Sequence, residues 1–244
     1  MAKLEPTSRW VEHLWLQDNW LQGNKIRAGL LIPRSAQSQS QAEQACWLTH
    51  QQRSPAFKSP TWLQQVHGTE LVQLPVIVPA VSEPPVCDGS ATQTPNVPCV
   101  VRTADCLALL IADSQAPRVA SVHAGWRGLS NGIVTQALAA FADHSHVKVM
   151  IGPAICKECF QVGDEVRAQF IDVGGAALKH FFEPHQAGGW HCALTEIAKY
   201  QLEALDVPAE QIQISLDCTY CNAGLPSYRR DQTKRRLSHW IWIE

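Results

Sequence analysis

The sequence predicts an α+β fold with a mixed sheet, and two observations carry this prediction. Residues 103–113 (TADCLALLIAD) and 119–128 (VASVHAGWRG) both have the composition of strands. The connection between them is of hairpin length and contains Pro117, so we expect an antiparallel pair. The apolar spacing then becomes helical over residues 130–142. Antiparallel strands mixed with helices favour an α+β domain over a parallel doubly wound sheet.

The remaining elements follow from apolar spacing and from turn residues. Residues 97–102, 107–112 and 147–151 are nearly continuous apolar runs, as expected for strands covered on both faces. No internal repeat or long linker divides the chain, so we expect a single domain over residues 1–244. Further strands are expected at residues 10–17, 25–32, 62–66, 71–78, 212–216 and 240–243, and helices at 42–50, 130–142, 164–173 and 194–205.

The composition excludes several classes of protein. Of the 244 residues, 45% are hydrophobic and 17% are charged, which is enough apolar material for a substantial core. The formal net charge of −2 gives no electrostatic reason to expect nucleic acid or an anionic membrane as a partner. The longest apolar stretches have the length of strands, so we expect no membrane span.

The cysteines indicate the compartment and a possible second metal site. The chain has nine of them and its first ten residues lack the apolar core of an export signal, so we expect reduced thiols in the cytoplasm. Two C-x-x-C pairs, Cys156/Cys159 and Cys218/Cys221, could together bind a structural zinc ion. They lie much farther apart than in common zinc ribbons, so we favour the interpretation that these cysteines are incidental.

The hairpin brings a cysteine and a histidine together. When the two strands fold back around Gln115, Cys106 falls opposite His123 to within one residue of register, and opposite Cβ atoms lie about 5 Å apart. Such a pair can bind one metal ion, or act as a nucleophile and its base. His67, at the end of a short apolar run, is the natural third ligand. The alternative is a cysteine that only packs in the core, beside histidines with structural partners.

Two histidines and one cysteine are typical of a catalytic zinc site, because three protein ligands leave a fourth position for water or substrate. The same ligand types also suit copper. Asp105 can orient a histidine from behind or pair with an arginine. Arg127 lies in A-G-W-R-G-L between a strand and a helix, where it can hold an anion such as phosphate or simply support a glycine turn.

Two further polar segments are candidates for substrate binding. Asp88 precedes a glycine and can also be a simple turn residue. Residues 227–231 (SYRRD) include Arg229 and can reach the site from the C-terminal side, or form a solvated turn.

These motifs together resemble a known family. Q-V-H-G, D-G, T-A-D-C, H-A-G-W-R-G, I-G-P and S-Y-R-R-D occur in that order between residues 65 and 231. This combination resembles the YfiH-like family, also called the laccase-domain or multicopper polyphenol oxidase family. The resemblance implies an αββα-type sandwich of mixed sheets with outer helices, and a zinc site formed by His67, Cys106 and His123. The chain departs from the family pattern at I-G-P-A-I-C, at Lys234 and at Leu225-Pro226.

The resemblance implies a zinc-dependent enzyme that phosphorolyses adenosine, inosine and methylthioadenosine and also deaminates adenosine, because family members are described in this way. Asp88, Arg127 and Arg229 are then the candidates for binding substrate, with one of the arginines holding phosphate. The expected partners are a purine nucleoside and phosphate, and the expected assembly is a monomer or a small homo-oligomer.

Three other functions stay open. Family members named peptidoglycan editing factors suggest a hydrolase of cell-wall precursors, with Cys106 as nucleophile and His123 as base, or with a metal. Copper oxidation of phenols is disfavoured, since multicopper chemistry needs many histidines and the chain has one H-x-H, at His144 and His146. A metal-binding protein without turnover is the third.

Overall fold

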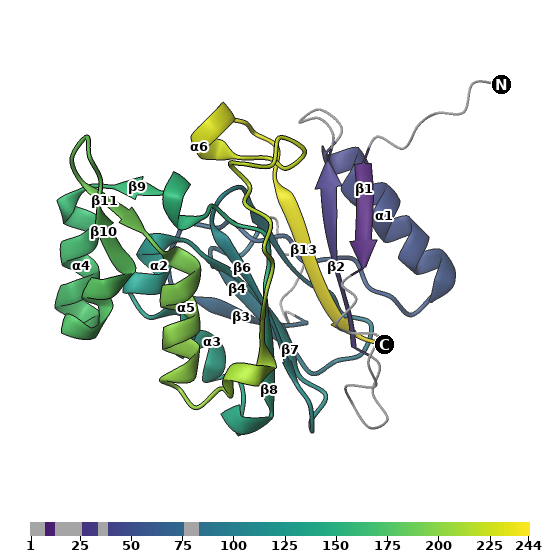
Figure 1. Cartoon of the computed structure of the whole chain (residues 1–244). Coiled ribbons are helices and arrows are strands. Elements are labelled where there is room, and N and C mark those ends of the chain that lie inside the picture. The colour runs from purple at the N-terminus through teal and green to yellow at the C-terminus, as the bar shows by residue number, and fades with distance from the viewer. Residues whose placement is uncertain (1–7, 13–25, 34–38, 76–82) are drawn as a thin grey trace.

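The computed structural model describes residues 8–12, 26–33, 39–75 and 83–244, and three sheets organise them (Figure 1). A four-stranded antiparallel sheet has the order β1 (Ser8–Glu12), β2 (Ile26–Pro33), β13 (Leu237–Ile243) and β5 (Cys99–Thr103). A six-stranded sheet has the order β12 (Ile212–Ile214), β8 (Val147–Ile151), β6 (Leu107–Asp113), β7 (Val119–Ala124), β4 (Gly89–Thr92) and β3 (Leu71–Leu74). The small third sheet contains β10 (Phe182–Pro184), β11 (Trp190–Cys192) and β9 (Gln161–Val162).

The six-stranded sheet is mixed. Its outer pairs, β12 with β8 and β3 with β4, are parallel, whereas its central pairs are antiparallel. The sequence prediction of an α+β fold with a mixed sheet is therefore confirmed.

Helices cover the outer face of each large sheet. The helix α1 (Gln39–Arg53) packs through Trp47 against the hydrophobic cluster that contains Val100, Trp240 and Trp242 of the four-stranded sheet. On the six-stranded sheet lie α2 (Trp126–Ser130), α3 (Ile133–Leu138), α4 (Asp164–Gly174) and α5 (Leu194–Glu203). In Figure 1, α1 stands at one side of the two sheets and α2 to α5 stand at the other. This is the αββα sandwich.

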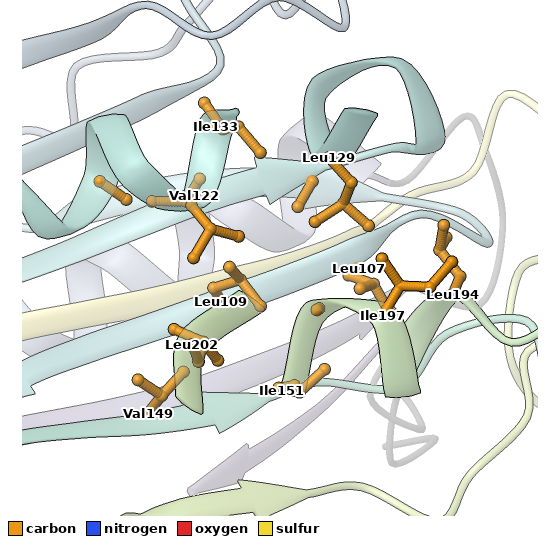
Figure 2. Packing of buried hydrophobic residues seen from close by; sticks show 14 of the residues in the cluster. Leu107, Leu109, Val122, Leu129, Ile133, Val149, Ile151, Leu194, Ile197 and Leu202 are labelled. Carbon is orange, nitrogen blue, oxygen red and sulfur yellow. The ribbon is translucent and has the colours of Figure 1, made fainter. Parts of the chain in front are cut away.

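Strand β6 shows why the middle of the sandwich is almost wholly apolar. Leu107, Leu109 and Ile111 pack against the helices, whereas Leu110 and Ala112 face the four-stranded sheet. Figure 2 shows Leu107 and Leu109 facing side chains of the helices. Because successive side chains of a strand point to opposite faces, a strand between two apolar layers must be apolar at every position. That is the origin of the continuous apolar run.

Glycine divides the helix that the sequence predicts over residues 130–142. Gly132 has φ of 92°, a left-handed conformation, and separates α2 from α3. Residues 62–66 form only an isolated bridge, from Gln64 to Val86. Of the predicted strands at 10–17, 25–32 and 71–78, residues 13–17, 25 and 76–78 lie outside the described part of the chain.

The T-A-D-C segment crosses from one sheet to the other. Strand β5 belongs to the four-stranded sheet and ends at Thr103. The next strand, β6, belongs to the six-stranded sheet and begins at Leu107. Asp105 makes this crossing with φ of 94°. Cys106 consequently lies at one open end of the sandwich, beside the end of β7 that carries His123.

The short helix α6 (Tyr228–Asp231) lies close to this end of the sandwich, just before β13 (Figure 1). Across the described ranges, no helix is both long enough and apolar enough to cross a membrane.

Candidate functional site

The structure brings the three expected metal ligands together. The ligating atoms of His67, Cys106 and His123 all lie within 4.8 Å of one another. His67 Nε2 lies 3.8 Å from Cys106 Sγ, and the two imidazole rings meet nearly edge to face with centroids 4.8 Å apart. His123 is buried, Cys106 is half-buried and His67 is exposed, so the group opens to solvent on the His67 side.

The sequence analysis expected Cys106 opposite His123 to within one residue, and in the structure the offset is two residues. His123 pairs with Ala108, and Leu107 pairs with Ala124. Cys106 is therefore a diagonal neighbour of His123 rather than the residue directly opposite. The two side chains still lie close together, because residues two apart on a strand share a face.

The carboxylate of Asp88 hydrogen-bonds to the loop of His67 and to the ring of His123. This buried carboxylate accepts hydrogen bonds from the backbone N–H groups of Val66, His67 and Gly68, at 2.7 to 3.1 Å. The same carboxylate lies 2.8 Å from His123 Nδ1. Burial by itself raises the pKa of Asp88, but the hydrogen bond with His123 and those from the amides outweigh it and lower the pKa below its ordinary value.

Asp88 was expected to bind substrate, and the structure gives it different surroundings. It is fully buried, and its carboxylate is occupied by the four hydrogen bonds. It holds the loop of His67, whose backbone has φ of 62°, and it fixes the ring of His123. When the neutral His123 ring donates through Nδ1 to Asp88, its lone pair lies on Nε2, the nitrogen that could bind a metal ion.

The electrostatics of the group favour a bound cation. Burial raises the pKa of the Cys106 thiol, but hydrogen bonds with His123 and His67 outweigh burial and lower the pKa below that of a free thiol. Burial lowers the pKa of His123, but hydrogen bonds to Asp88 and Cys106 outweigh it and raise the pKa. Two negatively charged groups, Asp88 and Cys106, thus flank one imidazole.

Asp105 ties the C-terminal segment to this site. Its carboxylate accepts hydrogen bonds from Thr219 Oγ1 and from the backbone N–H of Arg229, both at 2.6 Å. Neither a histidine nor an arginine guanidinium is bonded to it among the described residues, so the structure shows neither of the two expected roles. Asp105 instead fixes the start of α6.

The three ligands open into a cavity of about 670 Å³, which is the size of a small-molecule site. Three aromatic side chains and four arginines are among the residues that line it. Arg127 lies over the ring of Trp126, with its guanidinium carbon 4.4 Å from the centroid. Arg229 donates to the carbonyl of Gln161 at 2.8 Å. The aromatic residues are Trp126, Phe160 and Tyr228, and the arginines are Arg102, Arg127, Arg229 and Arg236.

The arginines of the cavity differ in their ion-pair partners. Arg102 forms a bidentate ion pair with the buried carboxylate of Glu43, at 2.9 and 2.6 Å, so its charge is neutralised. Within the described part of the chain, no carboxylate pairs with Arg127 or Arg229. Both guanidinium groups are therefore without a carboxylate partner in the part of the chain that the structure describes, and their binding of an anion stays a prediction.

The sequence analysis missed the two residues that hold Arg102 in place, Gln65 and Glu43. The side chain of Gln65 acts like a neighbouring strand, because it donates to the carbonyl of Arg102 and accepts from its N–H, both at 2.8 Å. The position of Gln65 in Q-V-H-G was the only available signal. Glu43 gave no signal, since it lies on a helix 59 residues away from its partner.

Comparison with known proteins identifies the family. The family model described as multi-copper polyphenol oxidoreductase laccase matches residues 37–244. The chain belongs to this family. A Shigella flexneri protein named purine nucleoside phosphorylase YfiH is 38% identical over 190 residues, which cover 75% of this chain and 74% of the relative. A Pseudomonas aeruginosa relative, also named a purine nucleoside phosphorylase, is 33% identical over 187 residues, which cover 76% and 74%.

Solved structures of the laccase-like YfiH family share the fold. A Neisseria meningitidis protein superposes with a TM-score of 0.79 at 26% identity, over 96% of this chain and 99% of that one. A Bacillus licheniformis YfiH protein superposes with a TM-score of 0.81 at 20% identity, over 100% and 98%. These likenesses confirm the expected YfiH-like fold.

The donor set differs from what the family's multi-copper description implies. Over the described ranges, two groups of side chains lie close enough to hold a metal ion, namely the triad of His67, Cys106 and His123 and a cluster of four cysteines. Neither supplies the many histidines of a multicopper centre. His144 is occupied structurally, since its two ring nitrogens lie 2.7 and 3.0 Å from the carbonyls of Leu205 and Leu138.

Proposed function

We propose that this chain is a zinc-dependent purine nucleoside phosphorylase, and that adenosine, inosine and methylthioadenosine are its substrates. One observation carries the proposal: an open set of three metal ligands shares a cavity with two arginines, Arg127 and Arg229, that pair with no carboxylate of the described residues. The names of the relatives support the same reaction class. We further propose that the cavity deaminates adenosine.

The three ligands fit zinc. Two imidazole nitrogens and one thiolate are typical zinc ligands, and three protein ligands leave a position for a small molecule. Asp88 meets the further requirement that a carboxylate orient the ligating imidazole through its second nitrogen. When bound, zinc would polarise an oxygen of the substrate or acidify a water molecule.

The residues of the chain account for binding and orientation. We assign phosphate to Arg127 and Arg229, because a planar guanidinium matches two phosphate oxygens at once. The purine fits the aromatic wall formed by Trp126, Phe160 and Tyr228, where its flat ring can stack. Holding phosphate and nucleoside together converts an encounter of two molecules into a reaction within one complex.

The proposed phosphorolysis exchanges one bond for another. A phosphate oxygen bonds to C1′ of the ribose while the bond from C1′ to the purine nitrogen breaks. The bonding electron pair leaves with the purine, and the proton carried by the attacking dihydrogen phosphate ends on the free base. In the deamination, water adds to adenosine and ammonia leaves, which gives inosine.

Chromatography of the products formed from adenosine, with and without phosphate, tests the proposal. We expect adenine that depends on phosphate, and inosine that does not. His123→Ala should abolish both products because it removes a ligand together with the partner of Asp88. Arg127→Ala should raise KM for phosphate at least tenfold, whereas Arg53→Ala, at the exposed end of α1, should leave it unchanged. Adenine formation without phosphate, or an unchanged KM in Arg127→Ala, contradicts the proposal.

One observation favours a second candidate, a hydrolase acting on cell-wall precursors. The carboxylate of Asp88 orients the base His123, and His123 in turn contacts the thiol of Cys106, whose pKa is lowered. This is the arrangement of a cysteine nucleophile. Removal of metal by a chelator separates the two candidates, because a thiol hydrolase keeps its activity and the zinc enzyme loses it. We place either enzyme in the cytoplasm, where its free cysteines stay reduced.

A further inference from the structure

We propose that Cys156, Cys159, Cys218 and Cys221 bind a second zinc ion, in a closed structural site separate from the triad. Their four sulfur atoms all lie within 4.8 Å of one another. A tetrahedron of sulfurs placed about 2.3 Å from zinc has edges of about 3.8 Å. The observed separation of 3.4 Å between Cys159 Sγ and Cys221 Sγ lies close to that value.

The chain builds the cluster from two similar turns. Cys156 lies 62 residues before Cys218, and Cys159 lies 62 residues before Cys221. A parallel bridge between Ala154 and Cys218 aligns the two segments. This alignment explains how two C-x-x-C pairs that are distant in sequence meet.

Backbone amides prepare one sulfur for a metal. Cys218 Sγ accepts hydrogen bonds from the N–H groups of Cys156 and Cys221, at 3.3 and 3.4 Å. Hydrogen bonds from amides stabilise negative charge on a sulfur atom, and a metal-bound cysteine is a thiolate. The turn after Cys218 is held by Arg230, whose guanidinium donates to the carbonyls of Thr219 and Tyr220 at 2.8 and 2.7 Å.

The four sulfurs use every position of a tetrahedral zinc ion, so this site has no place for a substrate. Its role would be to hold the C-terminal segment against the end of β8. That segment also carries Thr219 and Arg229, which bond to Asp105 beside the triad. The metal would therefore stiffen the cavity wall that contains Tyr228 and Arg229.

The test counts metal in the full chain, purified under reducing conditions and supplied with Zn²⁺ alone. A His67→Ala/His123→Ala protein, which lacks two of the three ligands of the triad, should retain about one zinc ion per chain. Adding Cys218→Ser/Cys221→Ser should remove it, whereas adding Cys46→Ser, a half-buried cysteine of α1 outside both groups, should not. Retention of zinc without the cluster, absence of zinc with it, or iron in its place overturns the proposal.

A second measurement does not depend on the folding of a double cysteine variant. Co²⁺ bound to the His67→Ala/His123→Ala protein should show the sulfur-to-metal charge-transfer bands of tetrahedral thiolate cobalt. Cys221→Ser, which changes the exposed member of the cluster, should weaken metal binding at least tenfold in competition with a chelator. Absence of the cobalt bands, or a disulfide between Cys159 and Cys221 in protein that binds no metal, refutes the site. Neither measurement uses enzyme activity, so failure of the proposed phosphorylase would leave the result intact.

Discussion

Replacing Asp88 by asparagine should disturb the hydrogen bonds that position the triad while leaving His67, Cys106 and His123 in the chain. The variant keeps the shape of the side chain but turns one carboxylate oxygen into an NH₂ group. In the native protein each oxygen accepts two hydrogen bonds: Oδ1 from the His67 amide and His123 Nδ1, and Oδ2 from the amides of Val66 and Gly68. Whichever way the asparagine turns, its NH₂ group faces two groups that were donors.

The magnitude follows from this count. Each buried donor left without an acceptor costs about 1–3 kcal/mol. The free energy of unfolding should therefore fall by about 1–3 kcal/mol if the NH₂ group faces the His67 amide and His123, and by about 2–6 kcal/mol if it faces the amides of Val66 and Gly68. If the NH₂ group faces His123, its Nδ1 must become an acceptor and its Nε2 then carries the proton, which blocks metal binding. If the NH₂ group faces Gly68 instead, the loop of His67 loses its support. In either case zinc affinity should fall by about 10- to 100-fold.

Competition with a chelator measures the zinc affinity, and urea denaturation measures the stability. Asp113→Asn is the matched control, because this buried aspartate accepts two amides through Oδ1 alone, at 2.7 and 3.0 Å, in the hairpin turn. An asparagine can keep both bonds with its single oxygen, so the control should bind zinc like the native protein. An Asp88→Asn protein with native zinc affinity and native stability would refute the reasoning.

Three further predictions test the surroundings of the site and the core. Gly125→Ala should lower zinc affinity, since the added Cβ would lie 2.8 Å from a ring carbon of His67 and 3.1 Å from the sulfur of Cys106. Gly68→Ala, whose added Cβ has contacts of 3.4 Å or more, should keep the native affinity. Equal zinc affinities of the two variants contradict this prediction. Leu109→Ala should lower the free energy of unfolding by about 2–5 kcal/mol in urea, because the side chain is fully buried, and a loss below about 1 kcal/mol contradicts it. In metal-free protein at neutral pH, iodoacetamide should modify Cys106, whose pKa is lowered, before Cys46, whose pKa burial raises to about 12; peptide mass mapping checks the order, and the rate at Cys106 should fall as pH drops through its pKa.

Most secondary structure could be predicted because its signals are local. The apolar run of β6, the short turn after it and the helical spacing near α5 each depend on neighbours within a few residues. Boundaries were less certain, and the break at Gly132 depended on a single backbone conformation. The triad was predicted for the same reason, since a hairpin places Cys106 near His123 by local geometry alone.

Contacts between distant segments could not be predicted in this way. The four amide and imidazole bonds of Asp88 depend on where the loop of His67 passes, and the ion pair of Glu43 with Arg102 depends on how α1 packs on the sheet. The two C-x-x-C pairs were interpreted as incidental because their sequence separation was large, yet the end of β8 lies beside the segment of Cys218.

The sequence by itself thus determined most of the local elements and the side chains that we propose for the chemistry. Only the tertiary structure decided which of those side chains lie close enough to hold a metal ion together, such as His123, and which hydrogen-bond to one of them, as Asp88 does. The physical reason is that the spacing of apolar residues over a few positions indicates whether a segment forms a strand or a helix. The choice of neighbouring elements depends instead on the packing of the whole core.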